Sequence, residues 1–549
     1  MISGEIFRNA VISAGINIKN KRTQIDELNV YPVPDGDTGT NMSLTLSAAV
    51  RELEMLTGNI SVSQAAETAA SAMLRGARGN SGVITSLLFR GFAKAFSGLD
   101  SADSKALANA LTLGSQAAYK SVMNPAEGTI LTVSRVAAEK AVELCEKVTD
   151  TAVLWEEVCT AAKDALAKTP EQLPVLKKAG VVDAGGQGLA VIYDSMLSVF
   201  NGGEVALPDE KKAVTRTFEA SNDIPDDEEI KYSYCTEYMV EKEAGCKDAF
   251  MLRAYLETIG DCVVVVEDDE VIKVHVHTND PGLAIQKGLE FGRFVNDPKP
   301  KIENMRIQQE MRLKEKKITQ KQEFKPVKPE KEYGFVAVAA GSGIEDMFRD
   351  LGVDCIIKGG QTMNPSTDDI LKAIHSTPAH NVFVLPNNKN IIMAAEQTIK
   401  LADRNVCVIP TRTIPQGLSA VMAFDESEDF SDNRMSMTKA IENVSTGQIT
   451  YAARDSEYEG HNIKKGEVLA FDNGKLRYNE KDLNKAAYKL VKKMIKGDSS
   501  FVNVFYGSDV APEQAEALAK ILEAKLGDKV EIMLMNGGQP VYYYIVSVE

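Results

Sequence analysis

Apolar residues recur at helical spacing through the first part of the chain. Segments 64–74 and 131–140 are typical, since Ala, Met, Leu and Val return there every three or four positions. We predict that residues 1–200 form an all-α domain. The pattern ends at the paired glycines of segment 201–203 and at the acidic run 223–229, which together indicate a linker.

Valine- and isoleucine-rich runs replace the helical pattern further along the chain. The runs 262–267 and 271–277 favour strands, and helical stretches lie between such runs. We predict a small α+β middle domain over residues 231–310. The following segment, 314–331, is charged, contains proline and is nearly free of apolar residues, so it predicts a second linker.

Short apolar strands alternate with helical segments in the last region, 332–549. Four of these strands are predicted at 333–339, 353–357, 381–385 and 406–409, and a final one at 541–548. The alternation is typical of βαβ units with a parallel sheet. The predicted fold class is therefore multidomain, with an all-α domain, a small α+β domain and an α/β domain. A length of 549 residues agrees, at about 150 residues per domain.

Charge and cysteine usage narrow the class of protein. A formal net charge of −16 would repel nucleic acids and anionic lipid headgroups, so we expect neither as a partner. The seven cysteines are scattered and form no Cys-x-x-Cys pair, which favours a reducing compartment. No run approaches the ~20 apolar residues of a membrane span, and the first residues do not resemble a signal peptide. We expect a cytoplasmic protein with no transmembrane segment.

Segment 29–41, NVYPVPDGDTGTN, is the richest candidate for a cation site. Its carboxylates Asp35 and Asp37 flank one glycine. A calcium loop would need glycine and glutamate where Thr40 and Leu46 stand, so an EF-hand is excluded. Mg²⁺, which prefers one or two carboxylates together with phosphates and water, remains possible. An Asx-turn followed by a helix cap would use the same residue types, and the loop alone leaves both interpretations open.

Three other segments of the helical region place glycine beside a polar helix start. They are 74–82, which contains three glycines and Ser81, the Glu-Gly-Thr of 127–129, and 183–188. Helix N-termini attract anions, and glycine lets phosphate oxygens approach the backbone. Neither a P-loop nor a Rossmann fingerprint is present. Four such starts in one domain suggest a shared phosphate-bearing ligand on some other nucleotide fold.

Taken together, these four motifs resemble the nucleotide-binding L-type domain of dihydroxyacetone kinases. Over its whole length and domain order, the chain is similar to the ATP-binding A subunit of bacterial fatty acid kinase. The resemblance implies a barrel of helices with ATP at one end and two Mg²⁺ ions held by Asp35 and Asp37. The third acidic ligand of the dihydroxyacetone kinases falls, after a one-residue shift, at Asn29. The residues expected around the phosphates or nucleoside are Asn29, Thr38, Thr40, Asn41, Gly79, Asn80, Ser81, Gly128, Thr129, Asp183 and Gly185.

Two of the five histidines stand in the middle domain, one residue apart on a predicted strand. His275 and His277 would point to the same face, which suits two metal ligands but also two histidines on a wet strand face. Cys235 could add a thiolate and leave a fourth coordination position open. The fatty acid kinase family places a zinc-type Cys/His/His site in this domain, and these three residues match it. Cys246 and Cys262 have no such match, and we expect them in the core.

The last region resembles the DegV-like fatty-acid-binding proteins that carry substrate for this kinase. The likeness rests on segment 359–366 and the strand order. Segments 340–344 and 537–541 depart from the carriers, which place Asp-Ser and a histidine there. We therefore expect docking or homodimerisation, rather than lipid binding, from this domain.

The resemblance implies transfer of the γ-phosphoryl group of ATP to a fatty acid carboxylate, presented by a separate DegV-like carrier protein, giving an acyl phosphate for phospholipid metabolism. A carboxylate is already ionised near neutral pH, so no general base is required. Arg78 would stabilise developing charge, unless it is an ordinary surface arginine. Two alternatives stay open: a dihydroxyacetone-type small-molecule kinase and a non-catalytic lipid-binding scaffold.

Overall fold

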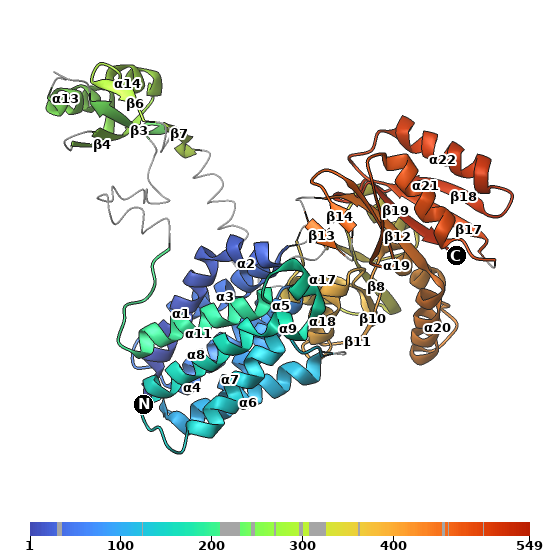
Figure 1. The fold of residues 1–549 in the computed structure, drawn as a ribbon, viewed down its shortest axis with the longest axis horizontal. Helices are drawn as coiled ribbons and strands as arrows, with labels where there is room; N and C mark the ends of the chain where they lie inside the picture. Colours follow the sequence, from blue (N-terminus) through green and yellow to red (C-terminus); the bar gives the residue numbers. More distant parts are fainter. Residues whose placement is uncertain are drawn as a thin grey trace. The chain divides into compact units, whose positions relative to one another are not determined.

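The computed structural model describes residues 1–29, 36–122, 125–208, 231–242, 248–267, 271–295, 300–306, 326–360, 363–452, 456–458, 461–497 and 499–549. The chain divides into two compact units (Figure 1). Unit 1 combines Met1–Asp209 with Lys325–Glu549, and unit 2 is Glu210–Phe324. The predicted linkers at 201–230 and 314–331 fall largely outside the described residues.

The first part of unit 1 is a closed ring of helices. Its helices are α1 (Gly4–Asn20), α2 (Arg22–Leu28), α3 (Thr38–Glu54), α4 (Val62–Gly76), α5 (Gly79–Ala95), α6 (Ser104–Ser121), α7 (Ile130–Leu144), α8 (Thr151–Ala167), α9 (Thr169–Gln172), α10 (Pro174–Ala179) and α11 (Ala184–Phe200). From α3 to α8 each long helix packs against the next, and α11 closes the ring against α8 and α1. We call this part the helical domain.

Aromatic side chains fill the centre of the helical domain. Trp155, the only tryptophan of the chain, is fully buried and stacks edge-on against Tyr193 and Phe200. Its indole N–H donates to the carbonyl of Tyr193 at 3.0 Å. Because this polar group is satisfied, the largest side chain of the core is buried without a hydrogen-bond penalty. Trp155 is therefore a single natural fluorophore for folding of this domain.

The prediction that this region is entirely helical is wrong at one place. Strand β1 (Ile2–Ser3) pairs in antiparallel fashion with β2 (Ser101–Ala102). Two residues on each side carry no detectable alternation of apolar and polar positions, so the sequence pattern could not reveal the pair.

The second part of unit 1 begins with a parallel sheet of order β11-β10-β8-β9. Its strands are β8 (Lys331–Ala339), β9 (Cys355–Lys358), β10 (Ala379–Leu385) and β11 (Asn405–Val408). Helices α17 (Thr367–Ser376) and α18 (Lys389–Thr398) share a core with one face, and α16 (Ser342–Asp350), α19 (Ile414–Met422) and α20 (Phe430–Asn443) share a core with the other. Both faces are covered, as a parallel sheet requires, and the predicted parallel sheet is confirmed.

A second, mixed sheet follows, of order β16-β15-β12-β19-β17-β18. Its strands are β12 (Ser445–Tyr451), β15 (Val468–Asp472), β16 (Lys475–Glu480), β17 (Phe501–Tyr506), β18 (Glu531–Asn536) and β19 (Tyr544–Val548); β13 (Ser456–Tyr458) and β14 (His461–Ile463) form a separate hairpin. Helices α21 (Leu483–Met494) and α22 (Pro512–Leu526) cover one face (Figure 1). The last strand starts three residues later than predicted, because Val541 has a φ of 71°, which no strand accommodates.

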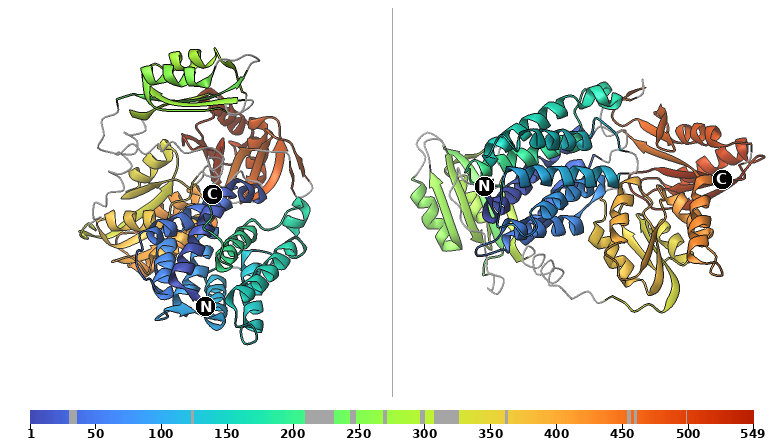
Figure 2. Two further views of the ribbon diagram at one scale, coloured as in Figure 1. Left: turned by 90° about the vertical axis from the view of Figure 1, so that its left-hand side faces the viewer. Right: turned by 90° about the horizontal axis from the view of Figure 1, so that it is seen from below.

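Unit 2 is an antiparallel sheet with helices on one face (Figure 2, left). It contains β3 (Tyr234–Lys242), α13 (Ala249–Ile259), β4 (Gly260–Glu267), β5 (Val271–Thr278), α14 (Pro281–Gly288), β6 (Gly292–Phe294) and β7 (Lys301–Asn304). Val274 and Val276 of β5 share a core with Leu252 and Leu256 of α13. Since side chains alternate along a strand, the intervening residues of β5 face the other side of the sheet.

The predicted fold class is confirmed: an all-α domain, a small α+β domain and an α/β region. In the described residues no helix combines the length and apolar character needed to cross a membrane.

Candidate nucleotide site and candidate metal centre

The first turns of α5 and α11 both press against α3. A β-carbon at Gly82 would lie 2.4 Å from the Thr45 hydroxyl oxygen, and one at Gly188 would lie 2.5 Å from the sulfur of Met42. Glycine allows these approaches without displacing the neighbouring side chains. The N-termini of α3, α5 and α11 therefore lie at one end of the helical domain.

The start of α7 joins the same group. A β-carbon at Gly185 would lie 3.2 Å from that of Ile130, the first residue of α7. Gly128, just before this helix, has a φ of 82°, and a β-carbon built on it would lie 3.0 Å from the Thr169 carbonyl oxygen. The four glycine-containing motifs of the sequence thus meet in space.

At two of the four helix starts, the side chain of the N-cap residue itself accepts a backbone N–H of the first turn. The Thr129 hydroxyl accepts the N–H of Leu131 at the start of α7, and the Asp183 carboxylate accepts the N–H of Gly186 at 2.7 Å in α11. Burial raises the pKa of Asp183 to about 6, against the opposing effect of the Gly186 and Ile130 N–H groups. Both residues thereby act as helix caps.

The starts of α3 and α5 differ, because their N-cap residues make no side-chain cap. Asp37 precedes α3 and Arg78 precedes α5. Thr38 is the first residue of α3. Asp35 lies outside the described residues. Asn29, expected as the shifted third ligand, ends α2, and its backbone N–H donates to the Asp26 carbonyl at 3.1 Å.

Asp26 is an acidic residue of this region that the sequence motifs did not reveal. Its carboxylate accepts the backbone N–H of Thr40 at 3.0 Å and the Thr40 hydroxyl at 2.8 Å. The hydroxyl of Thr40, expected beside the phosphates, is thereby used within the protein. Asp26 belongs to a short helix eleven positions before Asp37, and its type and spacing match no motif.

At the start of α5, the backbone of a glycine and several amide side chains lie close together. Gly79 has a φ of 58°, and a β-carbon there would lie 2.5 Å from the amide nitrogen of Asn41. The Asn80 amide nitrogen lies 3.5 Å from the Asn390 side-chain oxygen, whereas its own buried oxygen has no partner among the described residues. Ser81 lies inside the first turn, because α5 begins at Gly79 rather than after the serine.

Arg78 and Asp37 both contact the second part of unit 1. The Arg78 guanidinium donates to the Asn364 carbonyl at 2.7 Å and lies 3.2 Å from an Asp369 oxygen. The Asn364 amide donates to Asp37 Oδ2 at 2.7 Å. Asn364 belongs to segment 359–366, on which the likeness to DegV proteins rested. Sequence reasoning gave no sign that this segment would meet the candidate nucleotide site.

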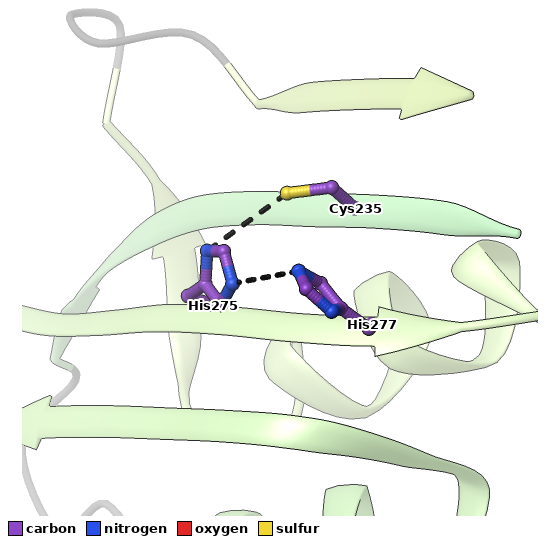
Figure 3. A group of neighbouring side chains, drawn as sticks. All are labelled: Cys235, His275 and His277. Carbon is purple, nitrogen blue, oxygen red and sulfur yellow. Dashed lines mark hydrogen bonds between the residues drawn. The ribbon is translucent and has the colours of Figure 1, made fainter. Parts of the chain in front are cut away.

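The candidate metal centre lies on the face of the unit 2 sheet opposite to α13 and α14 (Figure 3). Cys235 of β3 stands opposite His277 of β5. The Nε2 atoms of His275 and His277 lie 3.2 Å apart, and Cys235 Sγ lies 3.9 Å from His275 Nδ1. The three side chains are only 5–6% exposed. The potential ligand atoms of the three residues all lie within 4.8 Å of one another. Ligands of a tetrahedral zinc ion are roughly 3–4 Å apart, so the set suits an ion of that size.

One carboxylate bonds to His275, and a second lies near His277. Glu237 Oε1 lies 2.8 Å from His275 Nδ1, and this bond lowers the pKa of Glu237. Asp261 Oδ1 lies 3.7 Å from His277 Nδ1. Burial, reinforced by the neighbouring His275, lowers the pKa of His277, which favours the neutral imidazole that binds metal. Glu237 was not predicted to belong to this site. It lies two positions from Cys235 on the same strand, so the two-residue period of a strand places both side chains on one face.

The expectation that Cys262 is a core residue is wrong. It is exposed, with a φ of 49°, where the pairing of β4 with β5 shifts register between Asp261 and Val264. This irregularity, invisible in an apolar run, turns the side chain outward. Cys262 also forms a second group of potential ligands with Asp261 and His277. Cys246 lies outside the described residues.

Comparison with known proteins connects these features. Residues 32–198 match the DAK2 domain, 231–312 the FakA-like middle domain of fatty acid kinase, and 334–549 the FakA-like C-terminal domain. Protein YloV of Bacillus subtilis (strain 168) is 40% identical over 555 residues, covering 100% of this chain and 99% of that protein. The chain belongs to the FakA-like family of fatty acid kinase proteins. Uncharacterized proteins of Staphylococcus haemolyticus (strain JCSC1435) and Staphylococcus aureus (strain MRSA252) are 38% identical with the same coverage.

Solved structures also match parts of this family member. The dihydroxyacetone kinase from C. freundii in complex with AMP-PNP and Mg²⁺ is 18% identical, with a TM-score of 0.29, over 35% of this chain and 34% of that one. A fatty-acid-binding DegV family protein from Thermus thermophilus is 12% identical, with a TM-score of 0.30, over 39% and 99%. Family membership rests on the sequence matches, and the DAK2 domain identifies a kinase that uses a nucleotide and Mg²⁺.

Proposed function

We propose that this chain is the ATP-binding component of a fatty acid kinase. It transfers the γ-phosphoryl group of ATP to a fatty acid carboxylate held by a separate DegV-like carrier protein, giving an acyl phosphate. The observation that carries the proposal is the start of α5, whose N-cap residue makes no side-chain cap, near the carboxylate of Asp37 at the start of α3. In α3 itself, the Thr40 N–H is already bonded to Asp26. Helix N-termini suit the phosphates, and the carboxylate suits the metal.

Other side chains at this end fit a nucleotide. Gly79 leaves no room for a β-carbon, and the buried oxygen of Asn80 has no partner within the described residues, so it can accept a hydrogen bond from a ligand or a metal-bound water. Asp37, with Asp35, would hold Mg²⁺, which supplies neutralising charge to the phosphates when bound. Arg78, oriented by Asp369, adds positive charge beside the helix starts.

The helical domain contains no histidine that could act as a general base, which agrees with a carboxylate as the acceptor of the phosphoryl group. None of the five histidines of the chain lies before residue 275. A fatty acid is already ionised near pH 7, so phosphoryl transfer needs positioning and charge neutralisation but no base to remove a proton.

The contacts made by segment 359–366 agree with a separate carrier protein for the fatty acid. In this chain Asn364 and Ser366 meet Asp37 and Arg78 of the helical domain. A residue engaged in this way is not free to hold a fatty acid headgroup. We therefore assign presentation of the fatty acid to another protein.

The metal centre of unit 2 forms part of the proposal. Cys235, His275 and His277 would bind Zn²⁺ through one thiolate and two imidazoles, which leaves a fourth position open to water or substrate. Glu237 would fix the ring of His275.

Labelled γ-phosphate of ATP, followed onto oleate with and without a DegV-like carrier, tests the function. We expect label on oleate only when the carrier is present, and none after Asp37→Ala. Asp164→Ala, an exposed aspartate of α8, is the matched control and should behave as the unmodified protein. Transfer without a carrier, or undiminished transfer after Asp35→Ala and Asp37→Ala, would contradict the proposal. Label on dihydroxyacetone instead would favour a small-molecule kinase.

A further inference from the structure

The contact between the helical domain and the second part of unit 1 centres on Asn364. This side chain is only 4% exposed. Its amide nitrogen donates to Asp37 Oδ2 at 2.7 Å, while its backbone carbonyl accepts the Arg78 guanidinium at 2.7 Å. One residue therefore touches both the carboxylate assigned to the metal and the cation assigned to the phosphoryl group.

Backbone pairing fixes the position of this residue. The Thr367 N–H donates to the Ala77 carbonyl at 3.1 Å, and Ser366 forms an antiparallel bridge with Arg78. Ser366 and Asp369 form a capping box at the start of α17, so the segment is continuous with a regular helix. Asn364 is therefore held two residues away from a backbone bridge and a helix start.

Apolar packing makes the contact part of a core. Ala77, Val83 and Leu87 of the helical domain belong to the same buried cluster as Val336 and Ile370. Buried apolar surface of this kind stabilises the association of the two parts.

A carboxylate that binds a metal needs an orientation as well as a position. A hydrogen-bond donor on one carboxylate oxygen restrains rotation of the group, and removal of such partners typically lowers metal affinity 10–100-fold. The Asn364 amide stands in this relation to Asp37, since it donates to Oδ2 from a buried and anchored position.

We propose that Asn364 is a positioning residue of the phosphoryl-transfer site, through which the C-terminal part of the chain orients Asp37 for Mg²⁺. The proposal rests on the proposed function, because it takes Asp37 as a metal ligand. It gives the DegV-like region a role inside the kinase site of the same chain.

The test measures binding of a non-hydrolysable ATP analogue to the full chain as a function of Mg²⁺ concentration. We expect Asn364→Ala to raise the Mg²⁺ concentration for half-maximal binding about tenfold or more, with little change in analogue binding without Mg²⁺. The control is Asn381→Ala, whose amide bonds to Glu332 within the parallel sheet region. It should match the unmodified protein.

Trp155 fluorescence during urea unfolding shows whether the variants are folded, and the titration uses conditions in which both are. An unchanged Mg²⁺ requirement in Asn364→Ala would overturn the positioning role. A lower requirement would also overturn it, because the amide would then be an obstacle to the ion. If the unmodified chain binds the analogue without any Mg²⁺ dependence, the proposed function itself fails.

Discussion

The two candidate sites of this chain are built in opposite ways. The metal centre of unit 2 draws its three ligands from two neighbouring strands, and strand register alone brings them together. The candidate nucleotide site draws on four helix starts and on a residue 327 positions away in sequence. The first site is therefore a property of local pairing, whereas the second depends on packing of the whole of unit 1.

This difference decides what each site tolerates. A site fixed by strand register should lose function mainly through its ligands and their immediate partners. A site fixed by close approach of helices should also be sensitive to backbone changes that touch no ligand. Five substitutions test this contrast.

The largest effect is expected for Asp37→Asn. Loss of the charge should lower phosphoryl transfer at least about 100-fold, while zinc content measured by elemental analysis stays the same. Cys235→Ser should have the opposite effects on the two sites. Zinc should be lost, whereas Mg²⁺-dependent nucleotide binding should be retained. Loss of zinc in Asp37→Asn would mean that the two sites are not independent.

Gly79→Ala should show how strongly the nucleotide site depends on close packing. The new β-carbon would meet the Asn41 amide at 2.5 Å in a left-handed backbone conformation. We expect a loss of about 2–4 kcal/mol in the free energy of unfolding, followed by Trp155 fluorescence. Gly98→Ala is the control, because Gly98 has a φ of 76° but open space around it; it should cost about 1 kcal/mol. Equal losses would show that conformation alone matters.

Glu237→Ala should weaken zinc binding without removing a ligand. Loss of the 2.8 Å bond to His275 is expected to lower affinity about 10–100-fold in competition with a chelator. Glu241→Ala, on the same strand and paired with Arg293, should leave the affinity unchanged. A similar drop in both variants would point to general damage to β3.

The effect expected for Asp183→Asn depends on pH and disappears under acidic conditions. Burial raises the pKa of Asp183 in the folded state to about 6 from an ordinary 3.8. The folded protein therefore holds this proton more tightly than the unfolded chain, and stability falls as pH rises from about 4 to about 6. Asparagine caps a helix but does not titrate. The variant should be more stable by up to about 3 kcal/mol at pH 7 and equal near pH 4; equal stability at both values would contradict the burial effect.

The contrast between the sites also explains what the sequence could predict. His275 and His277 were recognisable because a strand has a period of two, and Cys235 joined them through the family resemblance. The helix start at Ile130 was predicted correctly, whereas segment 183–188, expected to precede a helix, forms the N-cap and first turn of α11. The capping by Thr129 and Asp183 was not predicted, since a helix cap was considered only for segment 29–41. A capping side chain and an anion use the same N–H groups, so the residue types do not separate the two roles.

Other features depended on tertiary contacts that no motif carries. Asp26 is engaged by Thr40 only because α2 folds against α3, and Asn364 meets Asp37 only because the parallel sheet packs on α5. Cys262 was misplaced because a register shift interrupts an apolar run. Strands β12, β15 and β16 were missed because short strands in mixed sequence have weak periodicity.

The apolar face of α5 has a consequence for synthesis of the protein. Val83 and Leu87 are covered by residues as late as Val406, and all of unit 2 lies between them in the chain. Roughly 320 residues must be added after Leu87, which takes about 15–60 s at typical bacterial translation rates of about 5–20 residues per second. During that time the helical domain has emerged from the ribosome with part of its core uncovered. A chaperone that binds exposed apolar helices should therefore associate with the nascent chain until the parallel sheet is complete.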